Sequence, residues 1–334
     1  MTLIHNPGIS AAHIERELGT ALDACRRGEL GQQALRSIDR QLRAAHWQAQ
    51  KESGIELVAA GDLAWYDRVL VQSLTFGVIP EGLIDTTLPS GLPTLDTLFG
   101  AARVERARWF DSDARYCVPE FTCDQRFRLS WEQLFEDVEQ AHALGHKVKP
   151  VLIGPLTYLW LGKAKDESFD RLELLDRLLP VYGEVLGRLA GLGVEWIQID
   201  EPILGLDLPQ AWKTGFERAY HSLQYSPLKK LIAAQFGVVP ENLGLVASLP
   251  VAGLHLDPVL TPEQLTHVLD RLPAYKVLSL GIANAGDSWT QDQPAALATL
   301  DLAQERFGEN LWFAGASSLP SEHAGEEVPI PLEA

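Results

Sequence analysis

The segment VEWIQIDEP, residues 194–202, has the apolar and β-branched residues of a buried β-strand. It leads directly into two neighbouring carboxylates, Asp200 and Glu201. Pro202 then ends the strand, because proline has no N–H to donate to a neighbouring strand. In parallel α/β folds ligands bind beyond the carboxyl ends of the strands, so we expect a functional site at this point of the chain.

Strands and helices alternate along most of the chain. Besides residues 195–199, the apolar pattern predicts strands at residues 55–59, 115–121, 148–153, 231–236, 253–256, 277–282 and 310–314. Segments with apolar residues at helical spacing separate most of them. Eight strands alternating with helices predict an α/β fold, a (β/α)8 TIM barrel. A doubly wound sheet is the alternative, but no predicted strand is followed by a Gly-x-Gly-x-x-Gly turn.

The barrel is predicted to occupy residues 55–319, with extra segments before and after it. Residues 1–54 carry two helical patterns, which we expect to pack on the barrel as N-terminal helices. These patterns lie at residues 11–27 and 30–51. An insertion near residues 77–107 has little periodicity. Residues 320–334 form a Pro-rich, acidic tail that does not resemble a helix, so the closing helix after strand eight is expected to be missing or supplied by something else.

Composition excludes several classes of partner. The 334 residues include 45 Asp and Glu against 28 Lys and Arg, a net charge of -17, which repels nucleic acids and anionic membranes. No apolar run approaches the length of a membrane helix, and residues 1–10 lack the pattern of a signal peptide, so we expect a cytoplasmic protein. The three cysteines have no zinc-site spacing, which fits a reducing compartment.

Polar residues follow the predicted strands where the mouth of the barrel would lie. The candidates for catalysis are Asp200, Glu201 and His255, because two neighbouring carboxylates can act as acid and base. Structural roles are the alternative: the acid pair can order a loop or cap a helix, and His255 can be a core histidine between Leu254 and Leu256. Further strand-end residues are Asp62, Glu120, Gly154, Pro155, Gln235, Asp257, Asn284, Asp287, Ser317 and Ser318.

Other kinds of site find less support in the sequence. No cysteine lies near a histidine in sequence, and we recognise no metal site. A Walker loop and a Gly-x-Ser-x-Gly elbow are also absent from the sequence. Aromatic residues gather after the first three predicted strands, where they can form a stacking wall for a flat ring or pack loops over the barrel. They are Trp65, Tyr66, Trp109, Phe110, Tyr158 and Trp160.

Four segments together resemble the N-terminal domain of cobalamin-independent methionine synthase, the 5-methyltetrahydropteroyltriglutamate–homocysteine methyltransferase. They are AGDLAWYD at residues 60–67, VPEF at 118–121, GHKVKPVLIGPLTYLWLGK at 145–163 and WIQIDEP at 196–202. The likeness extends over nearly the whole chain. It implies two (β/α)8 barrels in the full enzyme, with the zinc and homocysteine ligands in the second barrel. We therefore expect no cofactor in this chain, and zinc only in a partner domain.

The resemblance also implies candidate residues for binding the 5-methyltetrahydropteroyl-polyglutamate. These are Arg16 and Glu17 in an Arg-Glu-Leu stretch, and Arg108 and Trp109 before Phe110. The sequence departs from the family where Gly19 and Arg108 replace lysines and where residues 6–8, Asn-Pro-Gly, replace a Phe-Pro-Arg-Gly signature. Because a polyglutamate tail is anionic, the loss of cations and the net charge of -17 weaken the expected binding of that tail to this chain.

Three functional hypotheses remain. In the first, the chain is a stand-alone homologue of the first barrel, and it acts in methionine biosynthesis only together with a zinc-bearing C-terminal barrel. In the second, it is a non-catalytic module that binds a folate or an amino acid. In the third, it has been recruited to metal-free chemistry that uses Asp200, Glu201 and His255.

Overall fold

A computed structural model describes residues 3–8, 12–65, 67–110, 114–165, 169–235, 237–257, 262–283 and 293–315. The barrel strands are β1 (Leu3–His5), β2 (Val58–Ala60), β6 (Val148–Ile153), β8 (Trp196–Asp200), β9 (Lys229–Ala234), β10 (Gly253–Leu256), β11 (Val277–Ala283) and β12 (Leu311–Gly315). They form one parallel sheet in the order β1-β12-β11-β10-β9-β8-β6-β2. The two edge strands meet at a parallel bridge between His5 and Leu57, which nearly closes the ring. The predicted (β/α)8 fold is confirmed.

The structure corrects one predicted barrel strand. Residues 115–121 do not enter the barrel: β4 (Arg115–Cys117) pairs with β3 (Arg106–Arg108), and β5 (Glu120–Phe121) pairs with β7 (Lys163–Ala164). The eighth barrel strand is instead β1, in the segment predicted to contain only helices. Its three residues are too few to show a strand periodicity in sequence.

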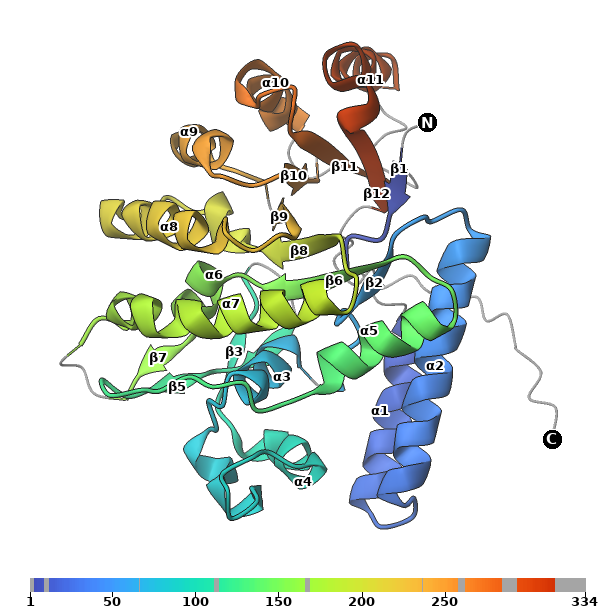
Figure 1. Cartoon of the computed structure of the whole chain (residues 1–334), viewed down its shortest axis with the longest axis vertical. Coiled ribbons are helices and arrows are strands. Elements are labelled where there is room, and N and C mark those ends of the chain that lie inside the picture. Colours follow the sequence, from blue (N-terminus) through green and yellow to red (C-terminus); the bar gives the residue numbers. More distant parts are fainter. Residues whose placement is uncertain are drawn as a thin grey trace.

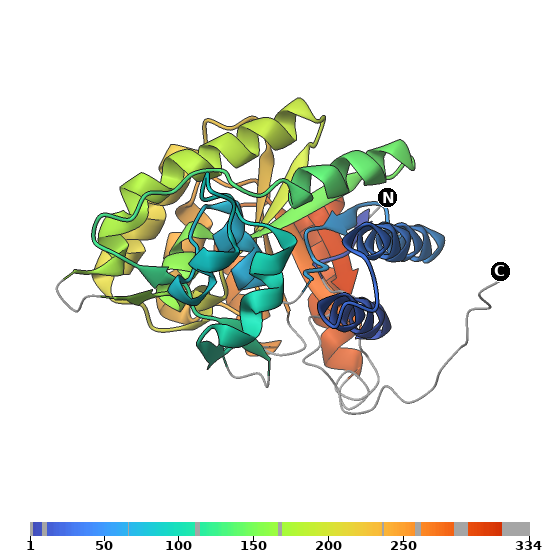
Figure 2. The same ribbon diagram turned by 90° about the horizontal axis from the view of Figure 1, so that it is seen from below.

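Helices cover the outside of the barrel (Figure 1). They are α1 (Ala12–Arg26), α2 (Gln32–Glu52), α3 (Arg68–Thr75), α5 (Gln133–Ala143), α6 (Pro155–Leu161), α7 (Leu175–Gly191), α8 (Gln210–Leu223), α9 (Pro240–Ser248), α10 (Pro262–Arg271) and α11 (Gln293–Phe307). Short 3-10 turns join some of them, at Arg171–Leu174, Pro202–Gly205 and Gly308–Asn310. The helices α1 and α2 pack against each other, and Figure 2 shows them end-on at one side of the barrel. Trp47 of α2 fixes the pair of helices to the barrel, since its indole N–H donates a hydrogen bond of 2.7 Å to the carbonyl of Ala59.

The predicted insertion holds short elements only. They are two 3-10 turns, Glu81–Thr86 and Gly100–Arg103, and the helix α4 (Leu95–Phe99). Leu83, Leu95 and Leu98 of this segment belong to the same buried cluster as Leu18 and Leu22 of α1. The predicted tail at residues 320–334 lies outside the described residues. No helix in the described part of the chain is long and apolar enough to cross a membrane, and the cytoplasmic location stays a prediction.

The inside of the barrel is apolar at one end and polar in the middle. Leu57, Trp196, Leu231, Val277 and Trp312 form the apolar layer near the start of the strands, with the two indoles 4.4 Å apart. Because side chains alternate along a strand, the next inward positions lie two residues further on. Those positions hold Lys149, Gln198, His255 and Ser279, together with His5 of β1, and all five are fully buried. TIM-barrel interiors normally hold bulky branched apolar residues there.

Candidate functional site

Asp200 is the centre of a polar network at the carboxyl end of β8. Its side chain points into the barrel and is fully buried. One carboxylate oxygen accepts from Arg68 at 2.6 Å and from Gln235 at 3.1 Å, and the other accepts from Gln198 at 2.7 Å. The Arg68 side chain is 25% exposed, so it joins the buried acid to the surface. The predicted strand-end position of Asp200 is therefore part of a charged constellation at the barrel mouth.

Gln198 extends this network from Asp200 to the N-terminal segment and to Lys149 of β6. Its amide nitrogen also donates to the carbonyl of Pro7 at 2.6 Å, and its amide oxygen accepts from the ammonium of Lys149. Lys149 is fully buried, and this burial lowers the pKa of its ammonium to about 7 even though the carboxylates of Asp200 and Asp62 oppose the shift. A chain of contacts thus runs from surface Arg68 through Asp200 and Gln198 to a buried amine.

The three polar residues of β1, β10 and β11 form a second cluster in the same interior. The hydroxyl of Ser279 lies 2.6 Å from Nε2 of His5 and 2.8 Å from Nδ1 of His255. The two imidazole rings are 5.7 Å apart. Burial and the nearby Lys149 lower the pKa of His255 to about 3, and the same two causes lower the pKa of His5. Both rings are therefore neutral at physiological pH.

Glu201 lies on the opposite face of β8 from Asp200, as alternation along a strand requires. Its carboxylate accepts from the backbone N–H of Thr157 at 2.8 Å and of Leu156 at 3.3 Å, at the start of α6. It also accepts from the hydroxyls of Thr157 at 2.6 Å and Tyr220 at 3.0 Å. Glu201 thus caps α6 outside the barrel interior, which corresponds to the structural alternative for the acid pair. Complete burial raises the pKa of its carboxyl to about 7.

The residues expected to bind folate lie on two different surface elements. Arg16 and Glu17 are exposed on α1, an outer helix. Arg108 is exposed at the end of β3, and Trp109 follows it at the turn of the β3–β4 hairpin, edge-on to Phe110 and Tyr116. Tyr66 and the strand-end residues Asn284, Asp287, Ser317 and Ser318 lie outside the described residues.

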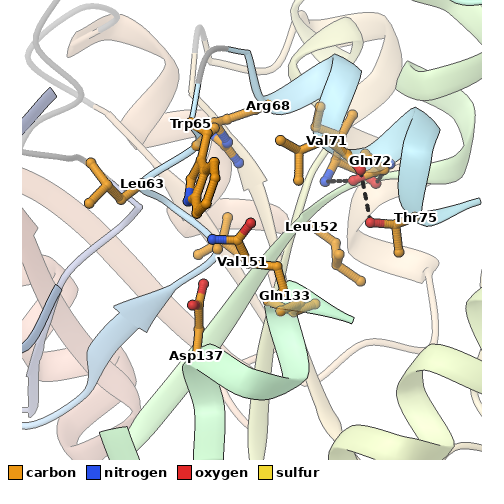
Figure 3. Close-up of a pocket in the computed structure, with 14 residues that line it drawn as sticks. Leu63, Trp65, Arg68, Val71, Gln72, Thr75, Gln133, Asp137, Val151 and Leu152 are labelled. Carbon is orange, nitrogen blue, oxygen red and sulfur yellow. Dashed lines mark hydrogen bonds between the residues drawn. The ribbon is translucent and has the colours of Figure 1, made fainter. Parts of the chain in front are cut away.

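A small cavity opens between β6, α3 and α5, beside the mouth rather than inside the barrel (Figure 3). Its volume is about 40 Å³, which suits water and is far below the few hundred Å³ of a typical ligand pocket. Trp65, Arg68, Gln133 and Asp137 contribute to its lining. A pterin does not fit this cavity.

A network of buried ion pairs joins α2 to Asp137 of α5, one of the residues that line the cavity. Arg43 donates one hydrogen bond of 2.9 Å to Asp39 and another of 2.9 Å to Asp137. Each of the three side chains is at most 7% exposed. Burial raises the pKa of Asp137 to about 7, although the guanidinium of Arg43 opposes the shift. The strand-end residue Asp62 is engaged in the same region, 3.3 Å from Nε2 of His46. These carboxylates hold α2 and α5 against the barrel.

Sequence reasoning missed Arg68, Lys149, Gln198, Ser279 and His5. For Lys149 and Gln198 a signal was present, because each is a polar residue at an inward position of an otherwise apolar strand. For His5 there was none, since β1 was not predicted.

The described residues do not fit a zinc ion. Three or more His, Cys, Asp or Glu side chains that could hold a metal do not converge anywhere in this part of the chain. Zinc in a partner domain stays a prediction.

The fold and this network define a (β/α)8 barrel with a polar, charged centre at the carboxyl ends of its strands. Residues 8–308 match the family model described as the N-terminal domain of cobalamin-independent synthase. The chain belongs to this family, and the resemblance found in its sequence is confirmed.

Solved structures share the fold at low identity. A B12-independent methionine synthase from Shewanella sp. W3-18-1, in complex with selenomethionine, is 14% identical with a TM-score of 0.62, over 86% of this chain and 83% of that one. A proposed vitamin-B12-independent methionine synthase from Listeria monocytogenes is 14% identical with a TM-score of 0.63, over 96% and 91%. A methyltransferase from Methanosarcina mazei is 12% identical with a TM-score of 0.60, over 96% and 89%.

Proposed function

We propose that the chain acts in methionine biosynthesis as a stand-alone homologue of the first barrel of cobalamin-independent methionine synthase. It takes part in methyl transfer from 5-methyltetrahydrofolate to homocysteine only together with a separate barrel of the family that carries zinc. Membership of the family over residues 8–308 carries the proposal. In such a pair the metal supplies the activation of the thiol, and this chain supplies a binding surface.

The polar mouth supports a binding role. Asp200 is buried and fixed by three donors, and Arg68 beside it reaches the surface, so a polar ligand at the mouth meets a cation whose position is set by the buried acid. Preorganised charges bind a ligand without the cost of rearranging side chains. The exposed cation at the mouth suits a ligand that carries a carboxylate.

Mixing the chain with a zinc-loaded C-terminal barrel tests the proposal. Transfer of a labelled methyl group from 5-methyltetrahydropteroyltriglutamate to homocysteine should appear in the mixture and in neither protein alone. The Arg68→Ala variant should transfer less in the mixture, because it removes the exposed cation of the mouth. Turnover by the single chain after treatment with a chelator, or a mixture no faster than the zinc barrel alone, would contradict the proposal.

The second hypothesis, a binding module without catalysis, is favoured by one observation: polar side chains occupy the middle of the barrel in place of a packed apolar layer. Calorimetry with 5-methyltetrahydrofolate tests its folate form. Saturable heat that falls in the Arg16→Ala or Arg108→Ala variant would support binding by the residues that the resemblance implies. Absence of heat at millimolar ligand would exclude it.

The third hypothesis proposed metal-free chemistry by Asp200, Glu201 and His255, and the geometry of the site removes Glu201 from this set. Glu201 is committed to α6 on the far face of β8, so it does not share a site with Asp200 and His255.

A further inference from the structure

Three buried carboxylates and one guanidinium meet where α2, α5 and the end of β2 come together. Arg43 of α2 binds Asp39 on its own helix and Asp137 on α5, and Asp62 follows β2. The four side chains are at most 7% exposed. Even with a protonated His46, which lies 3.3 Å from Asp62, three negative charges would face two positive ones. Because an unpaired buried charge is costly, a cluster of this composition favours an additional proton.

Asp137 is the member of the cluster that holds this proton. Burial raises its pKa to about 7, although the charge of Arg43 opposes the shift. Three neighbouring acids raise this pKa as well: Asp39, Asp62 and the exposed Glu136. Burial also acts on Asp62, but its contact with His46 and the charge of Arg43 lower its pKa overall, so Asp62 stays ionised.

Gln133 connects the cluster to the loop that follows β2. Its amide lies between the indole N–H of Trp65 and Nη2 of Arg43, two groups that can only donate. With its oxygen on that side, the amide accepts from Trp65 at 2.6 Å and from Arg43 at 2.8 Å, so we place the oxygen there. Figure 3 shows Trp65, Gln133 and Asp137 next to one another at the small cavity. Successive hydrogen bonds therefore join Asp137 to Trp65 through Arg43 and Gln133.

The small cavity gives the proton on Asp137 a route to solvent. Asp137 is among its lining residues, and its volume of about 40 Å³ suits water. Two further cations lie in this region, but each already has a partner. Arg68 lines the same cavity from α3 and is paired with Asp200, and Lys149 donates to Gln198.

We infer that this cluster is a proton switch that controls the hydrogen bond of Trp65 at the barrel mouth. With Asp137 protonated, Arg43 keeps its bonds to Asp39, Asp137 and Gln133. When Asp137 gives its proton to water in the cavity, its new negative charge attracts Arg43 more strongly. A guanidinium holds its N–H groups in a fixed fork, so this movement weakens the bond to Gln133 and, through it, the bond to Trp65. The switch involves this chain alone and does not rest on methyl transfer.

The indole N–H resonance of Trp65, measured by NMR on the ¹⁵N-labelled full chain, tests the switch. It should shift between about pH 5.5 and about pH 8.5, on either side of the pKa of Asp137, with a midpoint of about 7. Asp137→Asn should abolish the shift, because the amide does not titrate. Glu136→Gln is the matched control, since it removes an exposed carboxylate of the same helix. In this control the shift should remain and its midpoint should fall slightly, because one acid that raises the pKa of Asp137 is gone.

A second measurement uses the wild type alone, so it does not depend on the folding of a variant. The ¹³C resonance of the Asp137 carboxyl should titrate with the same midpoint as the indole resonance of Trp65. An indole resonance that stays constant with pH in the wild type, or that shifts equally in Asp137→Asn, would overturn the proposal. Different midpoints for the carboxyl and the indole in the wild type would overturn it as well, because the two groups would then titrate independently.

Discussion

Replacement of Glu201 separates a structural cap from a catalytic acid. In the Glu201→Ala variant the N–H groups of Leu156 and Thr157 and the hydroxyl of Tyr220 lose their acceptor. Each buried donor without an acceptor costs about 1–3 kcal/mol, so we expect a loss of about 4 kcal/mol in the free energy of unfolding. Glu201→Gln keeps the shape and most of the bonds, since the hydroxyl of Tyr220 can turn to accept from the new amide.

The Gln variant also reports the charge of the carboxyl. The pKa of Glu201 is about 7 in the folded protein, against an ordinary value of 4.5. Between these values the folded state binds a proton at Glu201 that the unfolded state does not, so this carboxyl adds stability as the pH falls. At pH 5.5, about 1.5 units below the folded pKa, the gain over pH 8 is about 2 kcal/mol. Glu201→Gln lacks this gain.

Urea unfolding of both proteins from pH 5.5 to pH 8 measures the difference. Glu195→Gln is the control, because that carboxylate is 69% exposed and pairs only with Lys229 in the described structure. It should follow the wild type within about 0.5 kcal/mol at each pH. A difference between wild type and Glu201→Gln that does not change with pH, or that grows as the pH rises, would refute the reasoning. A ligand-binding defect in Glu201→Gln at unchanged stability would return Glu201 to the site.

Three further predictions concern the frame of the barrel. Gly8→Ala should cost about 1–3 kcal/mol in urea unfolding, because the residue has φ +90° and an added Cβ would lie 3.2 Å from Val151. Arg43→Met should cost about 3–5 kcal/mol by the same measurement, because it leaves Asp137 and a second carboxylate buried without their cation. Deletion of the chain through β1, Leu3–His5, should broaden the calorimetric unfolding transition and raise light scattering, because it opens two strand edges.

The fold was predictable from the sequence because its strands are mostly continuous apolar runs between helical patterns. Two strands, Val148–Ile153 and Gly253–Leu256, were predicted with their observed bounds, and four of the others within two residues at each end. The exception, residues 115–121, has the right composition but is divided between two small sheets. Its replacement in the ring, β1, is held by pairing with β12 and β2, which come from distant parts of the chain. Local pattern carries no information about such pairing.

The candidate site was predictable in place but only partly in detail. The position of Asp200 at a strand end identified the mouth, and alternation alone puts Asp200 and Glu201 on opposite faces of β8. The sequence did not show which of them faces the interior. That choice follows from Trp196 and Gln198, which also face inward and occupy the apolar and polar layers. The contact of Arg68 with Asp200 joins residues 132 positions apart, and no spacing rule predicts it.

The N-terminal segment connects the departure from the family signature to the barrel interior. Residues 6–8, which lack the arginine of the signature, lie on the interior network: the carbonyl of Pro7 accepts from Gln198, and Gly8 packs against Val151. Just before them, His5 closes the ring and lies 2.6 Å from the hydroxyl of Ser279. Because Gln198 also accepts from Lys149, a change in residues 6–8 reaches that buried ammonium through a single side chain. The departure from the family signature thus lies on the polar network at the centre of the barrel.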